Sequence, residues 1–493
     1  MKKNVFVLLL AGLLAMQTVS CGGTETETDL TADTAAGEME SVEVETEPET
    51  TPLEALGTAD MGGMTFHIMD ANDYWDMHVN IHSGEQTGEP INDAVYERDA
   101  LVAENYNTVI TYQQELAGNG NTAFKNSVTA GDNNYNLIYT IALGSGLSSL
   151  TSAGMLYDLN SISSGEDVYW GNTWWSPLMY DTMQLNGKFY YTTGDIAACV
   201  YQAPSCVFYN ATMGLDYDQN VEDLYNMVLE GKWTYDVLGT MSEGLNEDLN
   251  GDNMYAQEDD FAGIIIQQKD KDCTNGLLVS CGISMSALDE SGTLTVDLMN
   301  DKTVSAIEML NDLLYSPAYT HETTKASTHY MFPEGRGLFL VHKVETATAA
   351  LRDMEDDFAI LPMPKYDEAQ DSYYSLISGW VHCFVGMPKT LTDPESNGFI
   401  TEALARAAYQ LVRPAAYETT LKGKAARDEQ SSQMLDLIFN SLYMDFNCLY
   451  DFGGVCSKIS TWLIEGEGFS SGYAALENPI QAAIEKVAEA YSE

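Results

Sequence analysis

The sequence predicts an α/β protein with two lobes. Short apolar runs of strand length alternate with helical patterns from about residue 58 onward, and strands separated by helices are typical of α/β layers with largely parallel sheets. The chain has 493 residues, which is more than one ordinary domain needs. Hydrophobic residues make up 45% of it, so the chain can bury a large core.

The individual elements follow from periodicity. Met64, Phe66 and Ile68 alternate with polar residues, as in a half-buried strand, and residues 91–106 form a helical pattern with Val95 on its apolar side. We further predict strands at residues 136–141, 189–192, 206–209 and 358–361, and helices at residues 305–315, 400–412, 434–442 and 480–491. Pro414 is expected to end the helix at 400–412.

The N-terminus predicts export. Residues 1–20 combine two lysines with an apolar run that is too short to span a bilayer and suits a signal peptide. The following Thr18-Val19-Ser20-Cys21-Gly22 resembles the cleavage box of bacterial lipoproteins, in which Cys21 carries the lipid. We therefore expect a lipid-anchored protein on the extracellular face of the cytoplasmic membrane or in the periplasm, held by lipid alone. Ordinary secretion with a free Cys21 is the alternative.

Residues 21–57 are predicted to form an acidic, disordered tether. Between residues 22 and 52 there are ten acidic side chains and no Lys or Arg. Such a segment buries too little apolar surface to offset the cost of ordering, and its like charges extend it.

The charge of the whole chain excludes one class of partner. It has 74 acidic against 22 basic side chains, a formal net charge of -52. A surface this negative repels phosphate backbones, so nucleic acid is not an expected partner. Self-repulsion of this size favours a soluble monomer.

Motifs of enzymes are missing from the sequence. It contains no GxSxG, HExxH, Walker or post-strand GxGxxG motif, so we assign no catalytic residue and expect no enzyme. Paired carboxylates of a glycan hydrolase stay open as an alternative, because sequence cannot place two acids across a cleft. Seven cysteines follow Cys21 without a CxxC; local disulfides and buried free thiols are both open.

One loop has the ligand spacing of a calcium site. Asp248, Asn250, Asp252 and Asp259 stand at positions 1, 3, 5 and 12 of a loop, where side-chain oxygens wrap a hard cation. Asn253 occupies the position of the usual Gly. A structural Ca²⁺ is therefore one interpretation and an Asx-rich turn is the other; no cofactor is required.

An ordered set of short motifs resembles a known family. EGKWTYD at 230–236, DLNGD at 248–252 and GI at 263–264 are similar to a segment of bacterial extracellular solute-binding proteins of family 1, the lipoprotein receptors of ABC importers. Further similarity lies in GEPINDAVYER at 88–98, YNLI at 135–138, GMLYDL at 154–159, FYN at 208–210 and FAILPMPK at 358–365. Asn136 replaces the family's usual Asp.

The resemblance implies a two-lobed, periplasmic-binding-protein-like (type II) fold with the ligand cleft between the lobes. We place lobe one at residues 58–205 plus 356–412 and lobe two at residues 206–355 plus 413–493. A ligand that contacts both lobes only when the cleft is shut shifts the equilibrium between open and closed forms. The resemblance implies that an ABC permease recognises the closed form.

Candidate ligand contacts are aromatic side chains and a carboxylate at strand ends, in the polar loop at residues 171–175 and after the return crossing to lobe one. Packing in the core or on a lobe surface is the alternative for each aromatic residue. Flat rings suit the apolar faces of sugars, and open α/β sheets hold ligands at their strand ends. The candidates are Trp380, Asp195, Trp175, Trp174, Tyr74 and Trp75.

The favoured function is capture of a polar solute, an oligosaccharide foremost, for an ABC importer of the carbohydrate type. Two alternatives are kept: a surface-anchored glycan hydrolase, and a sensory or adhesive binding protein that uses the same fold without transport.

Overall fold

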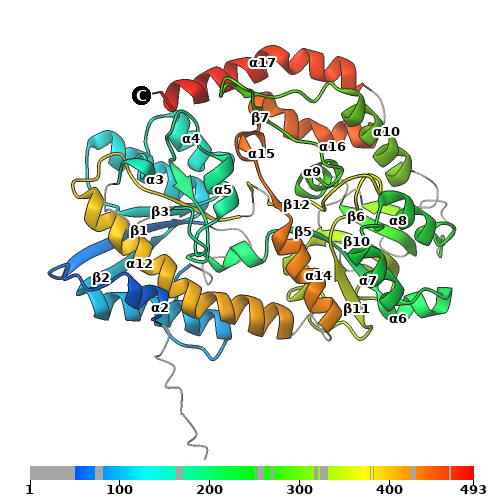
Figure 1. Ribbon diagram of the computed structural model, residues 1–493, viewed down its shortest axis with the longest axis horizontal. Helices are drawn as coiled ribbons and strands as arrows, with labels where there is room; N and C mark the ends of the chain where they lie inside the picture. Colours follow the sequence, from blue (N-terminus) through cyan, green and yellow to red (C-terminus); the bar gives the residue numbers. More distant parts are fainter. Residues whose placement is uncertain are drawn as a thin grey trace, which may run out of the picture. The chain divides into compact units, whose positions relative to one another are not determined.

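The computed structural model describes residues 50–72, 81–162, 170–249, 251, 260–267, 271–315, 320–322, 331–377, 379–380, 382–423, 429–465 and 468–492. Residues 50–493 form one compact unit (Figure 1). The predicted signal peptide, Cys21 and the tether up to residue 49 lie outside the described residues.

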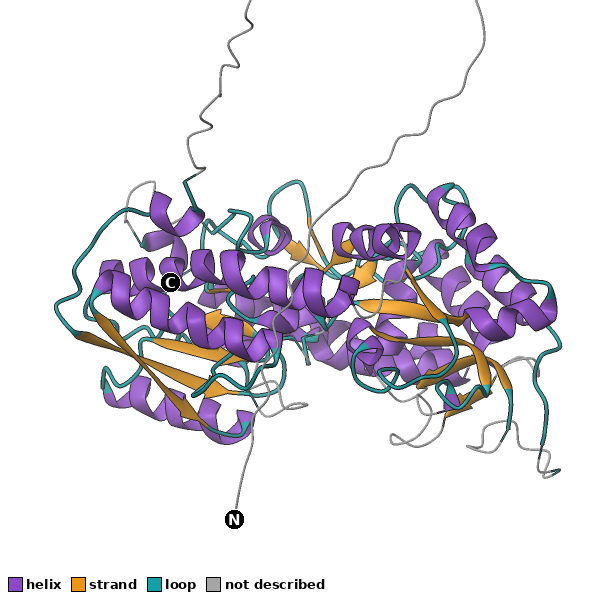
Figure 2. Ribbon diagram, turned by 90° about the horizontal axis from the view of Figure 1, so that it is seen from below, coloured by secondary structure: helices purple, strands orange, loops and turns teal. Residues whose placement is uncertain are grey.

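The first sheet has five strands in the order β2 (Thr108–Gln114), β1 (Met64–Ala71), β3 (Leu137–Thr140), β13 (Phe384–Gly386) and β4 (Tyr191–Thr192). β1 pairs in parallel with β2 and β3, whereas β13 is antiparallel to both of its neighbours. The helices α2 (Pro90–Tyr106), α3 (Ala117–Ala130) and α12 (Pro394–Arg413) belong to this half of the unit (Figure 1). Figure 2 shows that helices cover both faces of its sheet.

The second sheet has the order β11 (Phe358–Leu361), β5 (Ser205–Asn210), β10 (Gly337–Lys343), β6 (Ala262–Gln267) and β9 (Thr320–Glu322). β5 runs antiparallel to β11 and β10, and the other pairs are parallel. The prediction of largely parallel sheets is therefore wrong, because both sheets are mixed. In each sheet, the strand at which the chain enters from the other half (β13 in the first sheet, β5 in the second) is antiparallel to both of its neighbours.

Short elements complete the unit. The small sheets pair β12 (Ser375–Leu376) with β14 (Leu442–Tyr443) and β7 (Ala287–Leu288) with β8 (Leu294–Thr295). The other helices are α1 (Pro52–Ala55), α4 (Leu147–Ser152), η2 (Leu159–Ser161), α5 (Pro177–Thr182), η3 (Ala198–Tyr201), α6 (Ala211–Gly214), η4 (Leu215–Tyr217), α7 (Val221–Leu229), α8 (Tyr235–Ser242), α9 (Lys271–Ser280), α10 (Asp301–Tyr315), η5 (Val344–Ala347), η6 (Pro414–Lys422), α14 (Glu429–Asn440), α15 (Phe446–Tyr450), η7 (Phe452–Gly454), α16 (Val455–Glu465) and α17 (Phe469–Ala490).

The expected lobe boundary at residue 356 is wrong. β11 pairs with β5, so residues 358–361 complete the edge of the second sheet instead of returning to the first. The chain re-enters the first sheet only at β13, after β12. Burial explains why the run at 358–361 is apolar, since Ile360 pairs with Phe208 of the neighbouring strand and both side chains are buried.

The C-terminal residues also depart from the expected division, which assigned residues 413–493 to lobe two. α17 contacts β8 and also α4 of the first half. Its end is held there by a hydrogen bond of 2.9 Å from the Tyr190 hydroxyl to the Ala490 carbonyl, while its beginning is held by the Tyr473 hydroxyl, which donates to the Val296 carbonyl at 3.0 Å.

The last residues of the predicted tether are ordered. Residues 52–55 form α1, and Leu53 within it and Leu56 directly after it are buried against the first half. The Arg406 guanidinium of α12 donates to the Pro52 carbonyl at 3.1 Å. These leucines supply the apolar surface by which α1 packs on α12.

Pro414 does not end the helix at 400–412. α12 continues without a break into η6, a π-helical segment that begins at Pro414. Proline is tolerated at the first turn of a helical segment, where its missing N–H costs little. The seven cysteines after Cys21 are buried and free, and no helix among the described residues is long and apolar enough to cross a membrane.

Candidate functional site

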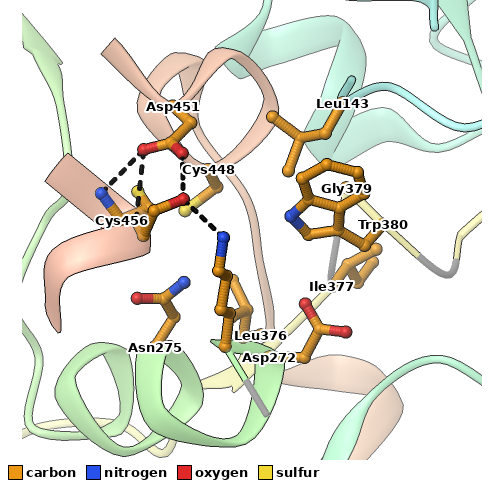
Figure 3. A pocket seen from close by; sticks show the side chains of 12 residues that line it. Leu143, Asp272, Asn275, Leu376, Ile377, Gly379, Trp380, Cys448, Asp451 and Cys456 are labelled. Atoms are coloured by element: carbon orange, nitrogen blue, oxygen red, sulfur yellow. Dashed lines mark hydrogen bonds between the residues drawn. The ribbon is translucent and has the colours of Figure 1, made fainter. Parts of the chain in front are cut away.

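A pocket lies between elements of the two sheets, and we call it the central cleft. It is nearly closed in this structure, with a cavity volume of about 10 Å³, which is room for about one water molecule. Figure 3 shows Trp380 and Leu143 on one side of it, and Asp451, Cys456 and Asn275 on the other. Its lining residues are Leu143, Lys271, Asp272, Asn275, Leu376, Ile377, Gly379, Trp380, Cys448, Asp451, Cys456 and Ser457.

The topology of the sheets explains why these residues meet. Leu143 follows β3 at the carboxyl end of a parallel strand of the first sheet, and α9 begins four residues after β6 of the second sheet. Trp380 stands in the segment that returns from the second sheet to the first. Loops at the carboxyl ends of strands are where open α/β sheets hold ligands.

The backbone beside Trp380 is fixed by the loop after β3. The carbonyl of Gly379 accepts hydrogen bonds from the amides of Ala142 and Leu143, both at 3.1 Å. The ring of Trp380 is half-buried and packs on Gly144, where an added Cβ would lie 3.2 Å from the ring. A flat ring held this way offers a stacking surface to a ligand.

Lys271 links α9 to the C-terminal helices. Its Nζ donates to the Ser457 hydroxyl at 2.8 Å and lies 5.9 Å from the centroid of the Trp380 ring. The Ser457 hydroxyl in turn donates to Oδ2 of Asp451 at 2.6 Å, and the Cys456 amide donates to Oδ1 at 2.8 Å (Figure 3). These bonds hold the ammonium and the carboxylate in place before any ligand arrives.

The charges around the central cleft are balanced. Lys271 is matched by Asp451 through Ser457, and Lys343 Nζ lies 3.5 Å from Oδ2 of Asp272 with both side chains nearly buried. Burial raises the pKa of the Cys448 and Cys456 thiols well above their usual value, so both stay protonated. Asn275 adds a buried amide oxygen that has no hydrogen-bond partner among the described residues. The cleft therefore suits a neutral ligand that donates hydrogen bonds.

Two of the predicted contact residues lie elsewhere. Trp175 and Asp195 line a second hollow, which has a volume of about 370 Å³ and shares no lining residue with the central cleft. The structure therefore brings these two residues together but keeps both apart from Trp380.

Trp174 and Trp175 have a partner of their own. Their indole N–H groups donate to the two carboxylate oxygens of Glu402 at 2.8 and 2.7 Å, and Arg406 Nε donates to the first of these oxygens at 2.8 Å. The guanidinium of Arg406 also stacks over Trp174, 4.5 Å from the ring centroid. Burial raises the pKa of Glu402, and the hydrogen bonds from Trp175 and Arg406 oppose this shift.

The remaining predicted residues are Tyr74, Trp75, Asn250, Asp252 and Asp259, which lie outside the described residues. Asp248 is described: its Oδ1 accepts a hydrogen bond of 2.5 Å from the Gly251 amide, as in an Asx turn. The calcium loop stays a prediction.

Sequence reasoning missed Lys271, Asn275, Asp451 and Ser457. The first two had a usable signal, because they follow a strand of the second sheet just as Asp195 follows β4. Asp451 and Ser457 had none, since they reach the central cleft from a C-terminal region with no recognisable motif.

Comparison with known proteins shows the fold. Comparison by sequence matches no protein-family model and no curated protein. UgpB from Mycobacterium tuberculosis in complex with glycerophosphocholine superposes with a TM-score of 0.56 at 12% identity, over 86% of this chain and 99% of that one. The chain has the fold of the ABC substrate-binding proteins.

Two further solved structures share this fold. A cyclo/maltodextrin-binding protein complexed with maltotetraose gives a TM-score of 0.54 at 13% identity, over 87% of this chain and 96% of that one. An ABC substrate-binding protein from Listeria monocytogenes in complex with cycloalternan gives 0.51 at 11% identity, over 87% and 98%. The predicted two-lobed α/β fold is confirmed.

Proposed function

We propose that this chain is an extracellular solute-binding lipoprotein that captures a neutral polar solute, an oligosaccharide foremost, for an ABC importer. The observation that carries the proposal is the central cleft, where the Trp380 ring faces balanced charges between the strand ends of two sheets. A sugar site needs an aromatic face together with fixed hydrogen-bond donors and acceptors. Trp380 supplies the face, and Lys271, Asn275 and Asp451 supply the donors and acceptors.

Capture of this kind requires opening. The walls of the central cleft approach closely: a Cβ on Gly379 would lie 3.0 Å from Leu143 Cγ and 3.1 Å from the Cys448 carbonyl oxygen. A sugar chain therefore enters only when the two sides separate, and closes them by contacting both. Such a ligand shifts the equilibrium toward the closed form by its greater affinity for that form.

The structural relatives support the class of solute. The cyclo/maltodextrin-binding protein was solved with maltotetraose and the Listeria protein with cycloalternan. Cys21 as the lipid-bearing residue, an acidic tether, a monomeric state outside the cytoplasm and an ABC permease as the partner complete the proposal. No bond in the solute is made or broken.

Titration calorimetry of the intact protein with maltotetraose and with cycloalternan tests the proposal, combined with chromatography of the recovered sugar. We expect saturable binding of at least one sugar, and recovery of that sugar uncut. Trp380→Ala should abolish or weaken the binding, whereas Tyr96→Ala, an exposed position on α2, should not. Shortened sugars would instead support the glycan hydrolase, and the absence of binding by both sugars would contradict the oligosaccharide class.

A further inference from the structure

The second hollow is a pocket with charged and aromatic walls. It lies between the segment after β4, which carries Asp195 and Tyr201, and the α12–η6 junction, which carries Arg413 and Tyr417. Phe439 of α14 closes another side. Since none of these residues lines the central cleft, a ligand here would not compete with a solute for contacts.

Asp195 presents an unsatisfied carboxylate oxygen to this hollow. Only 4% of the residue is exposed. Its Oδ1 accepts a hydrogen bond from the Tyr201 hydroxyl, whereas Oδ2 has no hydrogen-bond partner among the described residues. Arg413 Nη1 lies 3.8 Å from Oδ2, which is an ion-pair distance but too long for a hydrogen bond. A buried carboxylate in this state gains most from a cationic hydrogen-bond donor.

Arg413 can serve an anion at the same time. Its side chain is 41% exposed, and its guanidinium stacks 5.0 Å from the centroid of the Tyr409 ring, which fixes its plane. A planar guanidinium binds a carboxylate through two parallel hydrogen bonds. The hollow therefore offers an acceptor for a cation and a donor for an anion side by side.

One wall of the hollow is aromatic. Tyr201, Tyr417 and Phe439 form one cluster, with ring centroids 5.0 to 5.7 Å apart. Asp436 also lines the hollow, and its Oδ1 accepts from the Tyr417 hydroxyl at 2.6 Å and pairs with Lys422 at 2.9 Å. The cluster thus gives an apolar wall to a ligand whose charged end lies at Asp195 and Arg413.

We propose that the second hollow binds a zwitterionic α-amino acid with an apolar or aromatic side chain. Its ammonium would donate to Oδ2 of Asp195, its carboxylate would pair with Arg413, and its side chain would pack on the rings of Tyr201, Tyr417 and Phe439. This site goes beyond the proposed solute capture and does not depend on it.

Calorimetry of the intact protein with L-phenylalanine and with L-leucine tests the site, at about pH 8, where Asp195 is ionised although burial raises its pKa to about 7. We expect saturable binding of at least one of them. N-acetylation removes the ammonium charge and amidation removes the carboxylate, so the blocked derivatives should each bind at least about tenfold more weakly. Maltotetraose should not displace the amino acid.

Variants test whether the charged side chains of Asp195 and Arg413 bind the amino acid. Asp195→Asn and Arg413→Gln should each weaken amino-acid binding at least about tenfold, while Trp380→Ala should leave it unchanged. If Asp195→Asn does not fold, Arg413→Gln decides, because its side chain is partly exposed. Binding of neither amino acid up to about 1 mM, equal binding of the blocked derivatives, or normal binding by Arg413→Gln would each overturn the proposal. None of these results bears on sugar binding at the central cleft.

Discussion

The indole ring of Trp380 packs on Gly144, which lies in the loop between β3 and α4. Gly144 has a φ of +66°, and an added Cβ would lie 3.2 Å from Cζ3 of the ring. The ring therefore rests where only glycine leaves both the backbone conformation and the space. This contact joins the crossing segment to the first sheet and sets the angle at which the ring faces the central cleft.

Trp380→Ala should weaken sugar binding without unfolding the protein. Loss of an aromatic stacking contact costs about 1–3 kcal/mol of binding free energy, and the half-buried ring contributes little to either core. Calorimetry of the variant and of Trp380→Phe measures the effect, and the Phe variant should retain part of the affinity. Normal affinity of the Ala variant would remove this ring from the solute site.

Gly144→Ala should reduce both stability and sugar affinity. A left-handed backbone costs a non-glycine residue about 1–2 kcal/mol, and the new methyl group pushes against the Trp380 ring. Thermal unfolding and calorimetry measure the two losses. Gly118→Ala is a matched control, because a Cβ there meets no neighbour and the residue lies within α3. Unchanged sugar affinity in Gly144→Ala would show that the ring's angle does not matter.

Asp195 should make stability depend on pH. Desolvation raises its pKa to about 7 from a usual 3.8, although the Tyr201 hydrogen bond and the Arg413 charge oppose the shift. The folded state thus holds this proton more tightly than the unfolded state does between these two values. The stabilisation is complete below about pH 4 and is lost as the pH rises to about 7, with a slope of up to about 1.4 kcal/mol per pH unit.

Urea denaturation across this pH range measures the slope. Asp195→Asn should flatten it relative to the wild-type protein, because the amide does not titrate. Asp181→Asn, at an exposed position on α5, should leave it as it is. The same slope in wild type and Asp195→Asn would contradict the raised pKa.

The two tryptophans beside Glu402 should differ in their importance for stability. Trp175→Phe removes the indole donor to Oε2, so a buried carboxylate oxygen loses its partner at a cost of about 1–3 kcal/mol. Trp174→Phe should cost less, because Arg406 still donates to the same oxygen as Trp174. Urea denaturation compares the variants. An equal loss of stability would argue against this division of roles.

Binding measurements on these tryptophan variants test the earlier prediction that either ring touches the solute. We expect each variant to lose less sugar affinity than Trp380→Ala does. A larger loss would place the solute against α5 and α12 instead of in the central cleft.

Calcium should stabilise the protein if the loop from Asp248 to Asp259 holds an ion. EDTA would then lower the melting temperature, and added Ca²⁺ would restore it. Asp252→Asn would abolish the response, because it removes a carboxylate from the predicted ligands of the ion. An unchanged melting curve in EDTA would favour the Asx turn that the Asp248–Gly251 hydrogen bond already forms.

Local pattern was enough for most elements. Alternation at Met64, Phe66 and Ile68 predicted β1, and the apolar run at 358–361 predicted β11 to the residue. These predictions succeed because burial on one face leaves a period in the chain that neighbouring residues alone reveal.

The order of the strands in the sheets determines which residues line each of the two pockets. Trp380 faces Lys271 and Asp451, more than seventy positions away in either direction, only because β13 inserts beside β3 and α9 follows β6. Asp195 and Trp380 were grouped as one site, yet β4 at the sheet edge carries Asp195 into the second hollow. Periodicity records which side of an element is buried, whereas the identity of the residues opposite depends on pairings between distant strands. Those pairings leave no local trace in the chain.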